Sequence, residues 1–340
     1  MGEVDLPVET KQKLVEALGE FIEDVKVFLL DIGVDLEAIQ SADAFEKVKK
    51  LDDAVNAILV NDDSKREYLA LAYQVDRLFK AILPDKSANQ FGMDCKTIVV
   101  LAGKIKSLIP PADISDVMDA VEHLLDESIE PNGYLIEEKP TSGNYLDLSK
   151  INFEALKKQF ERGRKNTEAE RLRGALNSKL MKMIRLNKSR IDYYQKFQML
   201  IEEYNSGAKN VEAFYTELIS LARDLSLEEQ RSISENLNEE ELALFDLLTR
   251  PEVRLTPNER KKVKEVARDL LDTLKAERLV LDWRKHQQTR AAVQLKIQEK
   301  LDDLPLVYDK SLYQQKCSVV YQHIYDKYYG AGNSVYVSSN

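Results

Sequence analysis

The sequence predicts an all-α protein made of multi-helix bundle domains, with no substantial sheet. Its 340 residues include only 12 glycines and 9 prolines, so residues that break helices are scarce. Apolar residues recur at three- and four-residue spacing over long stretches, which is the pattern of amphipathic helices. No segment alternates between apolar and polar residues over a convincing length, so strands are not expected to dominate.

Composition places the chain among ordinary folded proteins. It is 44% hydrophobic and 32% charged, which lies outside the disordered range. No run of about 18 apolar residues and no signal peptide is visible, so we do not expect the chain to span a membrane. The two distant cysteines indicate a reducing compartment, which we expect to be the cytoplasm. Cys95 and Cys317 have no disulfide or metal spacing and are expected to be buried. The start at Met1-Gly2 is equally consistent with a native start and with a start inside a longer protein.

The first 143 residues predict an acidic helical bundle. Apolar stripes separated by short turns indicate four successive helices, as in other bundles of antiparallel neighbours. A shorter helix is expected at residues 117–125. The four main stripes cover residues 9–33, 44–60, 65–83 and 91–109.

A second helical domain is predicted for residues 144–250. It follows residues 130–143, whose clustered prolines and glycines predict a linker. Residues 153–204 have a helical pattern with expected breaks near Gly163 and Asn187. Further helices are predicted at residues 210–225, at 228–234 with Ser226 as the N-cap, and at 239–248 with Asn238 as the N-cap.

Residues 251–340 predict a C-terminal helical domain with a clear start signal. Thr256 occupies the N-cap, Pro257 the first helical position and Glu259 the third, which together form a capping box. Apolar residues from 263 to 274 then form a single stripe. A last helix is expected at residues 311–329, and the tail at 333–340 is expected to be either a frayed end or a short strand.

The net charge of -10 conceals a basic block in residues 151–200. These residues carry 13 Lys and Arg against 5 Asp and Glu, whereas residues 1–150 carry 16 against 30. Cations beside Tyr193 and Tyr194 are typical of a helix that contacts phosphates. An alternative stays open, in which the block is a solvated helix that pairs with the acidic N-terminal domain. The candidate nucleic-acid contacts are Lys179, Lys182, Arg185, Lys188 and Arg190.

No catalytic or metal motif is visible in the sequence. There is no glycine-rich phosphate loop, no dinucleotide fingerprint and no H-E-x-x-H, and the three histidines lie far apart. We therefore assign no catalytic residue, no metal ligand and no cofactor to this chain.

We expect the purified chain neither to hydrolyse ATP nor to cleave DNA, because it lacks both a phosphate cradle and a metal-binding carboxylate set. A coupled ATPase assay and a plasmid-cleavage assay check this. DNA-stimulated ATP turnover that survives further purification would contradict it.

Two stretches in the last third of the chain have distinctive sequence motifs. One is Leu-Thr-Pro-Asn-Glu-Arg-Lys-Lys-Val-Lys-Glu-Val-Ala-Arg-Asp-Leu-Leu from Leu255, and the other is Leu-Val-Leu-Asp-Trp-Arg-Lys-His-Gln-Gln-Thr-Arg-Ala from Leu279. They resemble the C-terminal region of type I restriction enzyme R subunits. The resemblance covers nearly the whole chain and is most specific in the last third. Further segments that are similar to this family lie at residues 78–85, 147–156, 166–170, 321–328 and 334–336.

The resemblance implies a parent subunit with an upstream nuclease domain and two helicase-like motor domains, which use ATP and Mg. This chain would be the non-catalytic C-terminal region that couples translocase and nuclease to the methyltransferase core in DNA restriction. Its partners would be the methyltransferase and specificity subunits, with DNA contact possible through the basic block. The alternative is a stand-alone helical nucleic-acid-binding protein that uses residues 151–200.

Candidate docking residues follow from the resemblance in the last third, since interfaces concentrate binding energy in Trp, Tyr and Arg. A core position for Trp283 stays equally open. His286 and His323 are expected to be polar core groups. The candidate partner-binding residues are Trp283, Arg284, Arg290, Tyr325 and Tyr328.

Overall fold

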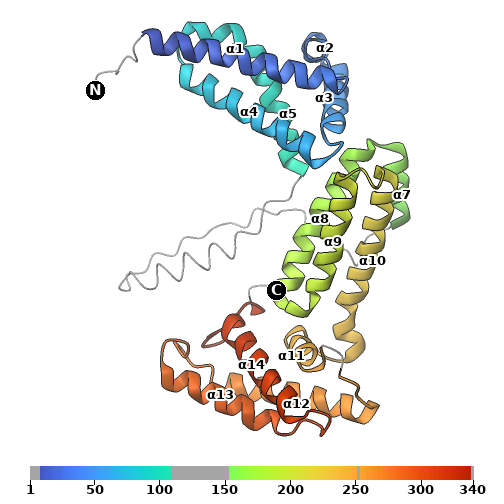
Figure 1. Cartoon of the computed structure of the whole chain (residues 1–340), viewed down its shortest axis with the longest axis vertical. Coiled ribbons are helices and arrows are strands. Elements are labelled where there is room, and N and C mark those ends of the chain that lie inside the picture. The colour runs from blue at the N-terminus through green and yellow to red at the C-terminus, as the bar shows by residue number, and fades with distance from the viewer. Residues whose placement is uncertain (1–7, 109–152, 251–252, 338–340) are drawn as a thin grey trace. The chain divides into compact units, whose positions relative to one another are not determined.

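The computed structural model describes residues 8–108, 153–250 and 253–337, which are almost entirely helical (Figure 1). The predicted all-α class is confirmed. The described ranges contain one small sheet, formed by two short antiparallel strands. The helix expected at 117–125 and the linker expected at 130–143 lie outside the described residues.

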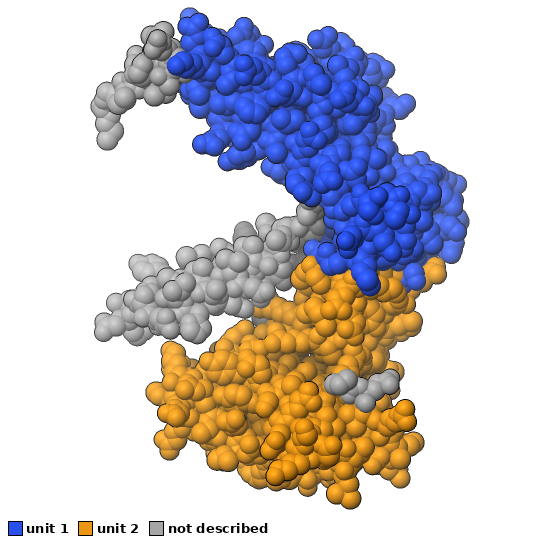
Figure 2. Space-filling model, viewed as in Figure 1, with its two compact units in different colours: residues 1–178, 197–220 blue, residues 179–196, 221–340 orange. Residues whose placement is uncertain are grey.

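The chain divides into two compact units (Figure 2). Unit 1 comprises residues 1–178 and 197–220, and unit 2 comprises residues 179–196 and 221–340. Three helices contribute to both units because the division falls within them. These are α8 (Lys165–Leu186), α9 (Ile191–Asn205) and α10 (Val211–Glu235).

The N-terminal part of unit 1 is a bundle with a continuous apolar core. Helix α4 packs against both α1 and α5, and the stripes predicted for these helices face inward. Buried Tyr68 satisfies its hydroxyl by donating to the carbonyl of Ile98 at 3.0 Å. The elements are α1 (Val8–Asp31), α2 (Leu36–Ser41), α3 (Ala44–Ile58), α4 (Asp62–Ile82), the 3-10 helix η1 (Lys86–Phe91) and α5 (Gly92–Leu108).

The first part of the basic block pairs with acidic helices of unit 1. From α8, Arg173 donates to both carboxylate oxygens of Asp62, at 2.6 and 2.7 Å. Arg164, which follows α7 (Phe153–Arg162), donates to Asp53 at 2.7 Å. Burial opposes ionisation of Asp62, but hydrogen bonds from Arg173 and Lys65 outweigh it and lower the pKa of this carboxyl. These ion pairs agree with the alternative in which the basic block pairs with the acidic N-terminal domain.

The predicted break at Ser226 is wrong. Helix α10 runs without interruption from Val211 to Glu235, so Ser226 lies inside the helix and is not an N-cap. Buried Leu225 and buried Glu228 on either side explain the continuity, because Leu225 packs in the interior and Glu228 accepts hydrogen bonds from two arginines. Long-range contacts override the capping preference of the serine.

Unit 2 has its own apolar core, which includes residues from α11 to the C-terminal hairpin. Helix α12 packs against α11 and α13, and α14 packs against α11 and α13. The predicted capping box at Thr256 with Glu259 is present. Asn238 is the N-cap of α11 as predicted, and it forms a second capping box with Glu241. The elements are the 3-10 helix η3 (Lys188–Arg190), α11 (Glu239–Thr249), α12 (Pro257–Glu277), α13 (Gln287–Leu301), α14 (Lys310–Lys327), β1 (Tyr328–Gly330) and β2 (Asn333–Ser334).

Candidate functional site

The turn between α12 and α13 buries the only tryptophan. Trp283 is 0% exposed, and its indole Nε1 donates to the carbonyl of Tyr328 at 3.1 Å. The ring of Tyr325 meets it edge-on, with centroids 5.9 Å apart and planes at 84°. Trp283 therefore lies in the core, which is one of the two positions that the sequence leaves open.

The hairpin closes against this turn through a glycine. Gly330 has φ +102°, and a Cβ there would lie 2.3 Å from the carbonyl oxygen of Val280 and 3.1 Å from Trp283 Cδ1. Ala331 N–H also donates to the carbonyl of Leu279 at 2.9 Å. Only glycine adopts this positive φ readily and also has no Cβ to clash with the Val280 carbonyl.

Arg284 is held by two tyrosine rings and by one backbone carbonyl. Its Nε donates to the carbonyl of Tyr328 at 3.1 Å, and its guanidinium carbon lies 4.4 Å from the Tyr329 ring centroid and 5.3 Å from that of Tyr325. Burial lowers the pKa of Arg284, although the nearby tyrosines oppose the shift. Arg290 donates in turn to the carbonyl of Arg284.

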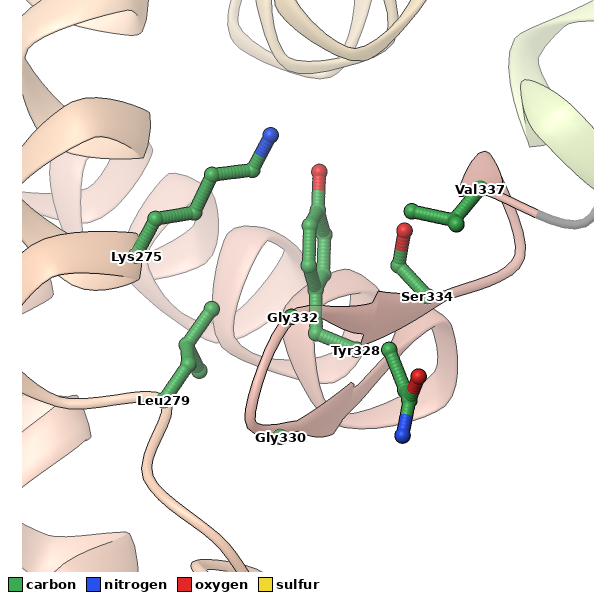
Figure 3. A pocket seen from close by; sticks show the side chains of 8 residues that line it. Lys275, Leu279, Tyr328, Gly330, Gly332, Ser334 and Val337 are labelled. Atoms are coloured by element: carbon green, nitrogen blue, oxygen red, sulfur yellow. The ribbon is translucent and has the colours of Figure 1, made fainter. Parts of the chain in front are cut away.

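Tyr328 is buried beneath a small cavity. Its hydroxyl donates to Glu240 at 2.7 Å, and Lys275 Nζ lies 2.6 Å from the same carboxylate. Burial raises the pKa of Tyr328, and the charge of Glu240 adds to the effect. The cavity has a volume of about 240 Å³ and is lined by Lys275, Leu279, Tyr328 and the hairpin; the polar ends of Lys275 and Tyr328 lie at the same end of it (Figure 3).

The five partner-binding candidates thus lie together in unit 2, and we call them the C-terminal cluster. Trp283 and Tyr328 are buried, whereas Arg284, Arg290 and Tyr325 are half-buried. The exposed aromatic beside them is Tyr329, which is 38% exposed. The four-residue spacing from Tyr325 to Tyr329 is the sequence signal that could have included it.

The five nucleic-acid candidates have different surroundings. Lys179 pairs with Glu229, and Lys188 lies 2.5 Å from Asp326. Arg190 is buried, Arg185 is half-buried and Lys182 is exposed. Three of the five are therefore engaged by carboxylates of their own unit, and phosphates would have to compete with these ion pairs.

Arg190 is the centre of a buried ion network. Its Nε donates to Glu228 at 3.0 Å, and its Nη1 and Nη2 donate to Glu239 at 3.0 and 3.3 Å. Glu228 also accepts from Arg231 at 3.0 Å. Burial opposes the charge, but Glu239 and Glu228 outweigh it and raise the pKa of Arg190. The network joins η3 to α10 and α11, so Arg190 holds structure together within unit 2.

The two histidines of the last third differ. His323 is buried, as predicted, and its Nε2 lies 3.1 Å from the hydroxyl of Tyr336. His286 is exposed at the N-cap of α13, so its predicted core position is wrong. The turn that buries Trp283 places His286 on its outer side.

Among residues 8–108, 153–250 and 253–337, no three His, Cys, Asp or Glu side chains are arranged to hold a metal ion. None of the described helices is long and apolar enough to cross a membrane. Cys95 and Cys317 are buried free thiols, as predicted.

A family model described as type I restriction enzyme HindI endonuclease subunit-like, C-terminal, matches residues 2–324. No curated protein and no solved structure matches the chain.

Proposed function

Because the chain belongs to the C-terminal family of HindI-like type I restriction enzyme endonuclease subunits, we propose that it couples the motor and nuclease parts of an R subunit to the methyltransferase core. The match over residues 2–324 is the observation that carries this proposal. This coupling role requires no catalytic activity in the chain itself. A cytoplasmic location, within a complex that contains methyltransferase and specificity subunits, is part of the proposal.

We infer that the docking surface includes the accessible part of the C-terminal cluster. Arg284 presents a guanidinium stacked on Tyr325 and Tyr329, and no carboxylate of the described residues forms a salt bridge with it. Its Nη2 is also buried without a hydrogen-bond partner there. A cation stacked on tyrosines is the kind of group that interfaces favour, and the cavity beside Tyr328 offers a recess for an apolar partner side chain.

Tyr329→Ala is expected to weaken binding to a methyltransferase–specificity complex by about 2 kcal/mol, about thirtyfold, because it removes an exposed aromatic anchor. Titration of the labelled chain with the purified complex measures the effect. Tyr73→Ala is the matched control, since Tyr73 is an exposed tyrosine of unit 1. Equal affinities for the two variants would place the docking surface elsewhere.

Removal of residues 251–340 is a cruder test of the same surface. The truncation deletes α12 to α14, whose apolar residues share a core with Leu242 and Leu248 of α11. If the truncated chain no longer binds the methyltransferase–specificity complex, this supports docking through the deleted residues only when circular dichroism shows that the remaining helices persist. Point variants at the surface avoid this ambiguity.

A further inference from the structure

A second recess of unit 2 gathers several arginines. It has a volume of about 400 Å³ and is formed by the end of α10, the end of α11 and the start of α12. Its wall also contains the carboxylates of Glu235 and Asp246, so among the described residues that line it the cations outnumber the anions. The lining cations are Arg231, Arg250, Arg254 and Arg260.

Two of the four arginines are neutralised inside the wall. Arg231 donates to Asp246, and Arg260 donates to Glu235 at 2.5 Å. Arg260 also lies over the Phe245 ring, with 4.8 Å between guanidinium carbon and centroid. These contacts fix the two guanidiniums in place.

The other two arginines carry the excess charge. Arg250 is half-buried, and its Nη1 donates to the neutral carbonyl of Ser189 at 2.8 Å. Arg254 is exposed on the segment leading into α12. Within the part of the chain that the structure describes, neither forms an ion pair with a carboxylate. A partly buried cation without a counter-charge favours binding of an anion, because its own solvation is reduced.

We propose that this arginine recess binds a phosphate group. Arg250 and Arg254 provide the attraction, and the fixed guanidiniums of Arg231 and Arg260 shape the wall. A phosphate has several oxygens that separate guanidiniums can bridge, whereas a carboxylate has only two. The phosphate belongs either to a nucleic-acid backbone or to a free phosphate compound, and the chemistry of recognition is the same.

The test compares Arg254→Gln with Lys262→Gln in the full chain. Lys262 is an exposed cation of α12 outside the recess, so it controls for the loss of one positive charge. The probes are inorganic pyrophosphate, followed by calorimetry, and a short DNA duplex of arbitrary sequence, followed by fluorescence anisotropy at low salt. Arg254→Gln is expected to weaken binding of at least one probe about tenfold or more, and Lys262→Gln less than about twofold.

The two probes distinguish the source of the phosphate. A selective loss for the duplex assigns the recess to backbone phosphates, and a selective loss for pyrophosphate assigns it to a free phosphate compound. Arg254→Glu is a second variant, expected to weaken binding further by repulsion, with circular dichroism confirming the fold of each protein. Binding of neither probe, or equal losses for Arg254→Gln and Lys262→Gln, would overturn the proposal.

Discussion

Arg190→Met is expected to lower the free energy of unfolding of unit 2 by about 3 kcal/mol. The Arg190 side chain is 2% exposed, and its substitution removes the guanidinium between Glu228 and Glu239. Glu228 is 4% exposed and, among the described residues, would keep Arg231 alone as a cationic partner. A buried carboxylate that loses one of its two cations is destabilised, because water cannot replace the lost interaction.

Denaturant unfolding followed by tryptophan fluorescence measures this effect selectively, because Trp283 is the only tryptophan and is buried in unit 2. Lys196→Met is the matched control. Lys196 pairs with Asp224 at 3.0 Å in the same unit, but both side chains are largely exposed, so its loss should cost less than about 1 kcal/mol. Equal destabilisation by the two substitutions would contradict a structural role for Arg190.

Acid is expected to destabilise unit 2 through His323. Burial lowers the pKa of His323 to about 3, the charges of Lys327 and Lys188 add to this, and Asp326 opposes it. In the unfolded chain the same group titrates near its ordinary value of about 6.5. Between these values the unfolded state binds more protons than the folded state, so stability rises with pH and is lost as the pH falls from about 6.5 towards 3.

The hydrogen bonds around His323 explain why its neutral form is retained. The hydroxyl of Tyr336 donates to the carbonyl of Leu186 at 2.7 Å, so it can only accept from His323 Nε2–H. This assignment leaves Nδ1 as the unprotonated nitrogen, and Nδ1 is buried without a partner among the described residues. A second proton on Nδ1 would therefore be a buried charge without an acceptor.

His323→Gln should remove this part of the pH dependence, because an amide can still hydrogen-bond Tyr336 but does not titrate. The expected difference from the unaltered chain is about 1.4 kcal/mol per pH unit below 6.5. Urea unfolding at a series of pH values, followed by Trp283 fluorescence, measures it. His286→Gln is the control, since His286 is exposed. If the free energy of unfolding varies with pH in the same way for the unaltered chain and for His323→Gln, His323 is not the source of the pH dependence.

The positions of most helices could be predicted from the sequence because their signals are local. Asn238 and Thr256 cap α11 and α12 as expected, since a capping box involves residues only three apart. The apolar stripe from Val263 to Leu274 is buried for the same reason, because helical periodicity alone decides which face is apolar. Helix α2 was not predicted: its six residues carry little periodicity, although Asp35 caps it by accepting from Glu37 N–H at 2.9 Å.

The roles of the charged and aromatic side chains depended on tertiary contacts. Arg190 pairs with carboxylates 38 and 49 residues away, so its place in a basic block gave no sign of burial. Lys316 is similar, because its buried ammonium donates to the carbonyl of Leu247 at 2.8 Å, near the C-terminus of α11. Trp283 is buried because Tyr328 and Gly330 close over it from the hairpin. Local periodicity determined the helices of this protein, while the partners of its charges and rings were decided only when distant segments packed together.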